Sequence, residues 1–204
     1  MQPISNKILS RIYGHGRGWA FFPNEFVGDF DRKQIDNALS DLAAEGKIRR
    51  ICRGIYDYPK YSELLAQELS PDFDQVARAF ARKFNWRIQP SGDAALNLLS
   101  LSTQVPGKYI YLSDGPNRNY AIGNYTLEFK KTVLKEVGFK HRESGIIVQA
   151  LKALGKNRIT SELLGKVRKE IDADMYPKIL KDTKTATGWI YDCIKEICRE
   201  GLNG

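Results

Sequence analysis

The stretch that decides the fold covers residues 31–59 and reads DRKQIDNALSDLAAEGKIRRICRGIYDYP. Its first part places apolar residues at helical spacing, after an Asp suited to an N-cap and before a Gly suited to a helix end. Its second part predicts two short strands, 48–51 and 55–58, joined by a turn. No acidic residue lies between positions 46 and 56. A helix followed at once by a basic hairpin is typical of a winged helix-turn-helix, which makes duplex DNA the expected partner.

The expected helix leaves side chains outside that suit base recognition. Ile35, Ala38, Leu39 and Leu42 turn inward, so the polar residues near the helix start stay exposed. Arg and Lys pair with guanine, Asn with adenine and Ser with either, and the helix amino end carries partial positive charge beside the phosphates. Asp36 lies among them and can pair with Arg32 or repel a phosphate. The predicted DNA contacts are Arg32, Lys33, Asn37 and Ser40 on the helix and Lys47, Arg49, Arg50 and Arg53 on the hairpin.

Composition agrees with a polyanionic partner without naming it. The 204 residues carry a net charge of +8, and the surplus is spread evenly apart from the cluster at 47–53. The three cysteines, Cys52, Cys193 and Cys198, show no paired spacing and are far from both histidines, so we expect reduced thiols and neither a metal nor a cofactor. No signal-peptide core or membrane-length apolar run occurs. We therefore expect a cytoplasmic protein that does not contact a membrane.

The pattern along the chain predicts an α+β protein of two domains. Residues 1–60 are expected to form a winged helix-turn-helix DNA-binding domain, and residues 61–204 a larger α+β domain with a helical end. Tyr61–Leu69 reads as a connecting helix. Further helices are expected over 70–84, over 92–99 and from 144 onward, and strands over 86–89, 109–112, 120–122 and 125–129.

Several segments together resemble the AbiEi-type antitoxins of type IV toxin–antitoxin systems, specifically the smaller members with a winged-helix N-terminus. The resemblance covers most of residues 1–140 and is looser beyond. AEGKIRR alone occurs in many winged regulators, and the GDAALNLLSLSTQVP segment makes the likeness more specific. The segments that carry it are GHGRGWAFFPNEF, LSDLAAEGKIRR, RGIYDYPK, PSGDAALNLLSLSTQVPGKYIYLSDG and YTLEFKK.

This resemblance implies a DNA-binding antitoxin without catalytic activity. Such a protein represses its own operon by binding inverted repeats and counteracts a nucleotidyltransferase-like toxin, without requiring a stable complex with it. Carried onto this chain, the resemblance assigns DNA contact to Arg32, Lys33, Asn37, Arg49, Arg50 and Arg53, and gives residues 61–204 the antitoxin role. The sequence does not name the operator, the toxin, the antitoxin surface or the oligomeric state, and a solitary regulator of this family fits as well.

Two other functions fit parts of the sequence. Asp114 followed by Glu128 and Lys130 has the Asp…Glu-x-Lys pattern of a Mg²⁺-dependent nuclease, in which two carboxylates hold the metal and the Lys lies beside the attacking water. The same alternation also describes the solvated face of an edge strand. Alternatively, the basic hairpin binds another protein. A nuclease is the principal alternative.

Overall fold

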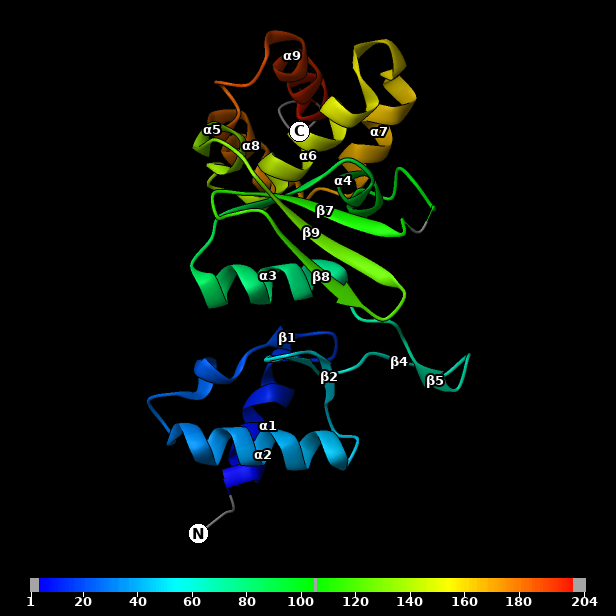
Figure 1. Ribbon diagram of the computed structural model, residues 1–204. Coiled ribbons are helices and arrows are strands. Elements are labelled where there is room, and N and C mark those ends of the chain that lie inside the picture. The colour runs from blue at the N-terminus through cyan, green and yellow to red at the C-terminus, as the bar shows by residue number, and fades with distance from the viewer. Residues whose placement is uncertain (1–3, 105, 200–204) are drawn as a thin grey trace. The chain divides into compact units, whose positions relative to one another are not determined.

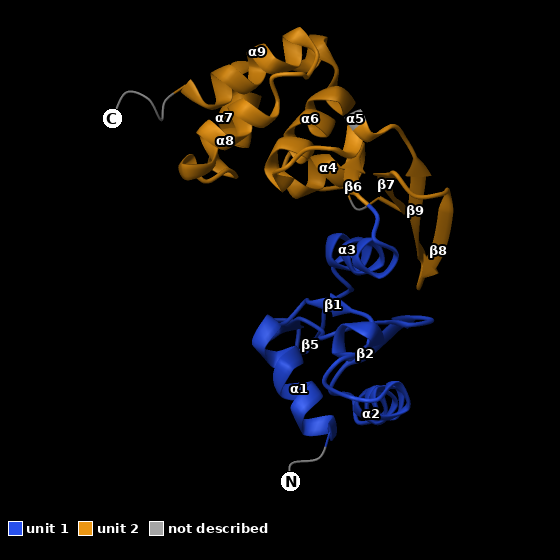
Figure 2. Ribbon diagram, turned by 90° about the vertical axis from the view of Figure 1, so that its left-hand side faces the viewer, with its two compact units in different colours: residues 1–86 blue, residues 87–204 orange. Residues whose placement is uncertain are grey.

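The computed structural model describes residues 4–104 and 106–199 and has a mixed α+β fold (Figure 1). The chain divides into two compact units, Met1–Trp86 and Arg87–Gly204 (Figure 2). Residues 61–86, which the sequence placed in the second domain, therefore belong to unit 1. Within the described part of the chain, no helix combines the length and the apolar character that a membrane span requires.

Unit 1 is a small antiparallel sheet between helices. Its strands lie in the order β1-β3-β2, with α1 and α2 packed on one face of the sheet and α3 on the other (Figure 1). The elements are α1 (Ile4–His15), β1 (Ala20–Phe21), the 3-10 helix η1 (Pro23–Phe26), α2 (Arg32–Ala44), β2 (Arg49–Cys52), β3 (Ile55–Asp57), β4 (Tyr61–Ser62), β5 (Gln67–Glu68) and α3 (Phe73–Phe84).

The ends of α2 are fixed by the residues that the sequence suggested. The Asp31 carboxylate accepts a hydrogen bond from the Lys33 amide at 3.1 Å, and the Gln34 side chain accepts one from the Asp31 amide at 3.3 Å, which completes a capping box. Gly46 follows the last turn with φ of 69°. The inward residues predicted for α2 are buried together with Ile8, Leu9 and Ile12 of α1. These two apolar stripes form the core of unit 1.

The connecting helix expected over Tyr61–Leu69 is wrong, because this segment forms the β4–β5 hairpin. The Ser62 hydroxyl accepts a hydrogen bond from the Leu65 amide at 3.2 Å, a local bond that competes with helix formation. The Leu69 amide donates to the Lys60 carbonyl at 2.8 Å and closes the loop. Leu64 is 95% exposed, so no buried contact stabilises an apolar helical stripe here.

Unit 2 is a four-stranded sheet followed by a helical layer. The strand order is β6-β7-β9-β8, in which β7 and β9 run parallel and the other pairs antiparallel. The elements are β6 (Ile88–Ser91), α4 (Asp93–Leu98), β7 (Lys108–Ser113), β8 (Arg118–Ile122), β9 (Tyr125–Lys131), α5 (Leu134–Val137), α6 (Arg142–Leu154), the 3-10 helices η2 (Lys156–Arg158) and η3 (Ala173–Met175), α7 (Ser161–Lys169), α8 (Tyr176–Asp182) and α9 (Gly188–Ile197). The helical end of the chain and the three strands expected between residues 109 and 129 are confirmed.

Helix α6 approaches the sheet closely at Gly145. A Cβ atom at that position would lie 2.0 Å from the Oε1 atom of Gln89, a buried side chain on β6. A glycine inside a helix costs up to about 1 kcal/mol relative to alanine, so its presence in α6 reflects this close approach. Gly165 in α7 has nothing within 4 Å of the corresponding position.

These two glycines should respond oppositely to alanine. We expect Gly165→Ala to raise the free energy of unfolding by about 0.5–1 kcal/mol, because it adds helix propensity in open space. Gly145→Ala should lower the free energy of unfolding by about 1–3 kcal/mol, because the buried Gln89 amide must move. Urea unfolding followed by circular dichroism measures both changes. Equal stabilisation of the two variants would contradict the close packing of α6 on β6.

Candidate nucleic-acid interface

One face of α2 is free to meet a ligand. Lys33, Asn37 and Ser40 recur at helical spacing on the side opposite the buried stripe of α2, and all three are exposed. Their side chains form no hydrogen bond or ion pair with any residue that the structure describes. This face therefore presents one cation and two hydrogen-bonding groups near the amino end of the helix.

Arg32, the fourth residue predicted on this helix, is already engaged. Its Nε atom donates to the Asp36 carboxylate at 2.9 Å, and its Nη1 atom donates to the side-chain oxygen of Asn24 on η1. Half of the Arg32 side chain stays exposed, yet its main interactions tie η1 to the start of α2. The pairing of Arg32 with Asp36, considered from the sequence, is present, whereas the bond to Asn24 had no signal in the sequence.

Arg49, which the sequence predicts to contact DNA, is engaged inside unit 1 and is not a free cation. Its Nε and Nη2 atoms donate to the two carboxylate oxygens of Asp57 at 3.1 and 2.7 Å, directly across from it on β3. Its Nη1 atom donates to the Leu69 carbonyl at 2.9 Å. The Asp57 side chain is only 2% exposed, so this bidentate ion pair stabilises the interior of unit 1.

Arg50 and Arg53 remain as the free cations of the hairpin. Arg50 is in register with Tyr56, which stacks on Phe21 in the core formed by α1 and α2. Because side chains alternate along a strand, Arg50 lies on the α2 side of the sheet and Arg49 on the opposite side. Arg53 precedes Gly54, whose φ of 75° makes the tight turn. Both arginines are exposed, and neither has an ion pair with a described residue.

Lys47 lies in the turn between α2 and β2 and is paired with an acid. Its Nζ atom is 2.7 Å from a Glu45 carboxylate oxygen, and both side chains are exposed. The hydrogen bond to Glu45 raises the pKa of Lys47 above its ordinary value. An exposed pair of this kind exchanges partners easily, so Lys47 can still turn to a phosphate.

The burial of the Asp57 carboxyl explains why its pair with Arg49 matters for stability. Burial raises the pKa of the Asp57 carboxyl above its ordinary value, and the hydrogen bond and charge of Arg49 pull it back only in part. A buried carboxylate without a partner costs several kcal/mol. Arg49 therefore stabilises the sheet that presents Arg50 and Arg53.

The residues of the nuclease alternative do not form a metal site. Asp114 accepts a hydrogen bond from the Arg87 amide at 2.8 Å, which ties the end of β7 to the start of β6. Glu128 is in register with Ile110, which precedes Asp114 by four residues. Glu128 and Asp114 are therefore about 13 Å apart along the strand direction. The Glu128 carboxylate instead pairs with Lys108 at 3.1 Å and Lys130 at 3.9 Å. No group of three or more metal-binding side chains occurs among the residues described.

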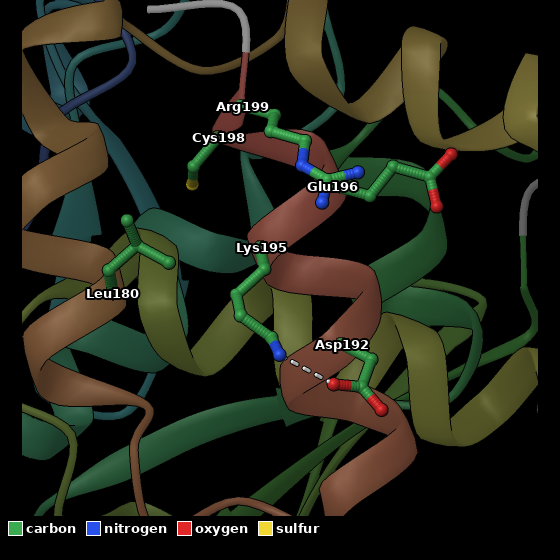
Figure 3. Close-up of a pocket in the computed structure, with 6 residues that line it drawn as sticks. All are labelled: Leu180, Asp192, Lys195, Glu196, Cys198 and Arg199. Atoms are coloured by element: carbon green, nitrogen blue, oxygen red, sulfur yellow. Dashed lines mark ion pairs between the residues drawn. The ribbon is translucent and has the colours of Figure 1, made fainter. Parts of the chain in front are cut away.

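A cavity of about 400 Å³ between α8 and α9 offers no evident chemistry (Figure 3). Lys195 and Asp192 line it and pair with each other at 2.8 Å. Burial raises the pKa of the Cys198 thiol to about 11, so the thiolate that a nucleophile needs is scarce at neutral pH. Figure 3 shows this cysteine beside Arg199, just after the end of α9.

Replacing Arg49 should destabilise the fold because the buried Asp57 carboxylate is left without its partner. We expect Arg49→Met to lower the free energy of unfolding at pH 7 by about 3 kcal/mol, because Asp57 loses its partner. The Asp57 pKa is already raised in the folded state, so its neutral form favours folding at low pH, and this contribution is lost as the pH rises through the folded pKa. Loss of Arg49 raises the folded pKa of Asp57 further, so the difference between variant and wild type should shrink as the pH falls through this raised pKa and the carboxyl becomes neutral.

Urea unfolding at several pH values measures this effect, with Arg50→Met as the matched control. Arg50 is exposed on the neighbouring strand position, so its replacement should change stability by about 0.5 kcal/mol or less. A destabilisation of Arg49→Met that is the same at every pH would assign the effect to the packing of the side-chain stem.

Comparisons with known proteins add a family to this geometry. No curated protein matches the chain. Among solved structures, the crystal structure of the RV2827C protein from Mycobacterium tuberculosis is similar over 97% of this chain and 77% of that one, with 9% sequence identity and a TM-score of 0.41. A family model described as a family of unknown function matches residues 7–179. The chain belongs to that family, DUF6088.

Proposed function

We propose that unit 1 binds duplex DNA and that the protein is a sequence-specific repressor of its own operon, acting in the cytoplasm. The observation that carries the proposal is the set of free cations, Lys33, Arg50 and Arg53, contributed by α2 and the β2–β3 hairpin. Cations without internal partners neutralise phosphates without breaking an interaction that the fold needs. Arg50 lies on the α2 side of the sheet, so the hairpin and α2 can act on the same duplex.

The order of elements supports this mode of binding. Helix α1, strand β1, η1, α2 and then a hairpin is the order of a winged helix-turn-helix, with η1 in place of the middle helix. We propose that α2 enters the major groove through Lys33, Asn37 and Ser40, which can read base edges. The β2–β3 hairpin then binds the adjacent backbone through Arg50 and Arg53.

Acidic residues limit how far the interface extends toward the carboxyl end of α2. Asp41 lies in the third turn and Glu45 directly follows the helix, and both repel phosphates. Base reading is therefore proposed only for residues that precede Asp41. A single unit covers a short half-site, and we propose that two copies bind an inverted repeat.

Neutralising the three free cations should weaken DNA binding in a salt-dependent way. We expect the triple variant Lys33→Ala, Arg50→Ala, Arg53→Ala to bind all duplexes less tightly. The slope of log K against log salt concentration should become shallower by about 0.9 for each phosphate that is no longer neutralised. Fluorescence anisotropy of labelled upstream DNA at several salt concentrations measures both quantities.

Two controls separate this effect from a general decrease in positive charge and from base reading. Lys166→Ala with Lys195→Ala removes two paired cations of unit 2 and should leave affinity and slope unchanged. Asn37→Ala should lower affinity for the operator by about 1–3 kcal/mol and leave unrelated duplexes unaffected. An unchanged slope of log K against log salt concentration in the triple variant would contradict the proposal that these three cations neutralise phosphates.

The antitoxin role is the second part of the proposal, and it is supported by the resemblance of the sequence segments to AbiEi-type antitoxins. We propose that unit 2 counteracts a nucleotidyltransferase-like toxin, without requiring a stable complex. The positions of the described carboxylates do not favour the Mg²⁺-dependent nuclease, since Asp114 is about four strand residues away from the position opposite Glu128.

Co-expression with a nucleotidyltransferase-like gene from the same operon tests this role. We expect the full chain to restore growth of cells that express the toxin. The triple variant of unit 1 should restore it equally, because its defect lies in DNA binding. Lack of rescue by a well-expressed wild-type protein would leave a DNA-binding regulator without antitoxin activity.

A further inference from the structure

A second cationic site lies at the edge of the sheet in unit 2. A cavity of about 550 Å³ opens where β8 begins and β9 ends, on the edge strand of the sheet. It lies in unit 2, whereas α2 and the β2–β3 hairpin belong to unit 1. Its lining residues are Asn117, Arg118, Asn119, Glu128, Lys130 and Lys131.

Glu128 is the one acid among the described lining residues, and it is already paired with two lysines. The Glu128 carboxylate is 3.1 Å from the Nζ atom of Lys108, which does not line the cavity, and 3.9 Å from that of Lys130. Its side chain is 17% exposed, so little of its negative charge faces solvent. An anion that enters therefore meets a positive surface.

Two of the cations that line the cavity have no partner among the described residues. Arg118 and Lys131 are exposed, and neither side chain makes a hydrogen bond or ion pair with any residue that the structure describes. They differ in this from Arg49, Arg158 and Arg168, whose guanidinium groups donate to carboxylate or carbonyl oxygens. Arg118 and Lys131 are thus the free charges of this edge, as Arg50 and Arg53 are those of the hairpin.

An amide beside these cations is oriented to donate. The Asn117 side-chain oxygen accepts a hydrogen bond from the Lys131 backbone amide at 2.6 Å. Its NH₂ group is therefore left to donate to a ligand. By the strand register, Arg118 and Lys131 lie on one face of the sheet, and Asn119 and Lys130 lie on the other. Arg118, Lys131 and the Asn117 amide therefore supply a guanidinium fork, an ammonium group and an amide donor, which suits a group with several acceptor oxygens.

We propose that this cavity binds a phosphate group, with Arg118 and Lys131 as the charged ligands and Asn117 as an oriented donor. The phosphate belongs either to a nucleic-acid backbone or to a free nucleotide, since both present the same oxygens. The competing explanation is that charge on an edge strand only prevents pairing with another sheet. That explanation requires no ligand.

Titration calorimetry with inorganic pyrophosphate tests the site directly. We expect the wild-type chain to bind pyrophosphate and the double variant Arg118→Gln, Lys131→Gln to bind it at least about tenfold more weakly, the decrease expected when one charge-assisted hydrogen bond is removed. Glutamine keeps the length and polarity of the side chains, and circular dichroism confirms the fold. Lys166→Gln with Lys195→Gln should leave the affinity unchanged.

The location of binding is read from the side-chain amide resonances. Addition of pyrophosphate should shift the NH₂ signals of Asn117 in ¹⁵N-labelled protein and leave those of Asn37 on α2 in place. Absence of binding, or equal affinity in the double variant, would overturn the proposal and favour a purely protective edge.

Two further ligands identify the source of the phosphate. Tighter binding of a short single-stranded oligonucleotide than of adenosine monophosphate, with the difference abolished in the double variant, assigns the site to a nucleic-acid backbone. Equal binding of the two assigns it to a free phosphate ligand. The triple variant of unit 1 should bind pyrophosphate normally, so failure of the DNA-binding proposal would not affect this outcome.

Discussion

The Arg49–Asp57 pair is the interaction on which the arrangement of unit 1 depends. The carboxylate is almost fully buried in the middle strand of a three-stranded sheet, where it would be unstable alone. Its two-pronged bond holds β2 in register with β3, and the third bond of Arg49 fixes the chain after β3 at the Leu69 carbonyl. Because neighbouring residues of a strand point to opposite faces, the same pair directs Arg50 to the α2 side of the sheet.

Several other arginines also serve the fold. Arg82 binds Glu25 and the Ala20 carbonyl and so attaches α3 to β1. Arg158 and Arg168 donate to carbonyls near the ends of α6 and α9, where the helix dipole is negative. The net charge of +8 is therefore a poor guide to binding. The informative quantity is which cations keep their charge free, and these include Lys33, Arg50 and Arg53 in unit 1 and Arg118 and Lys131 at the β8–β9 edge.

The sequence predicted well where local rules dominate. The capping Asp31, the apolar stripe of α2 and the glycine after it define that helix without help from the rest of the chain. The prediction for 61–69 failed because a hydroxyl bond and the Leu69–Lys60 closure outweighed a weak helical pattern. The domain boundary was placed at residue 60, before α3, because no pattern in a single sequence shows that α3 packs on β1 and β3.

The sequence by itself determined the mixed α+β class, the helix of residues 32–44 and the basic hairpin after it, because periodicity, caps and turns act over a few residues. Only the tertiary structure decided which cations are free. Arg49 and Arg50 are adjacent and chemically identical, yet one neutralises a buried acid and the other faces solvent. The choice between them depends on strand register and on burial of Asp57, and both arise from packing between residues far apart in the chain.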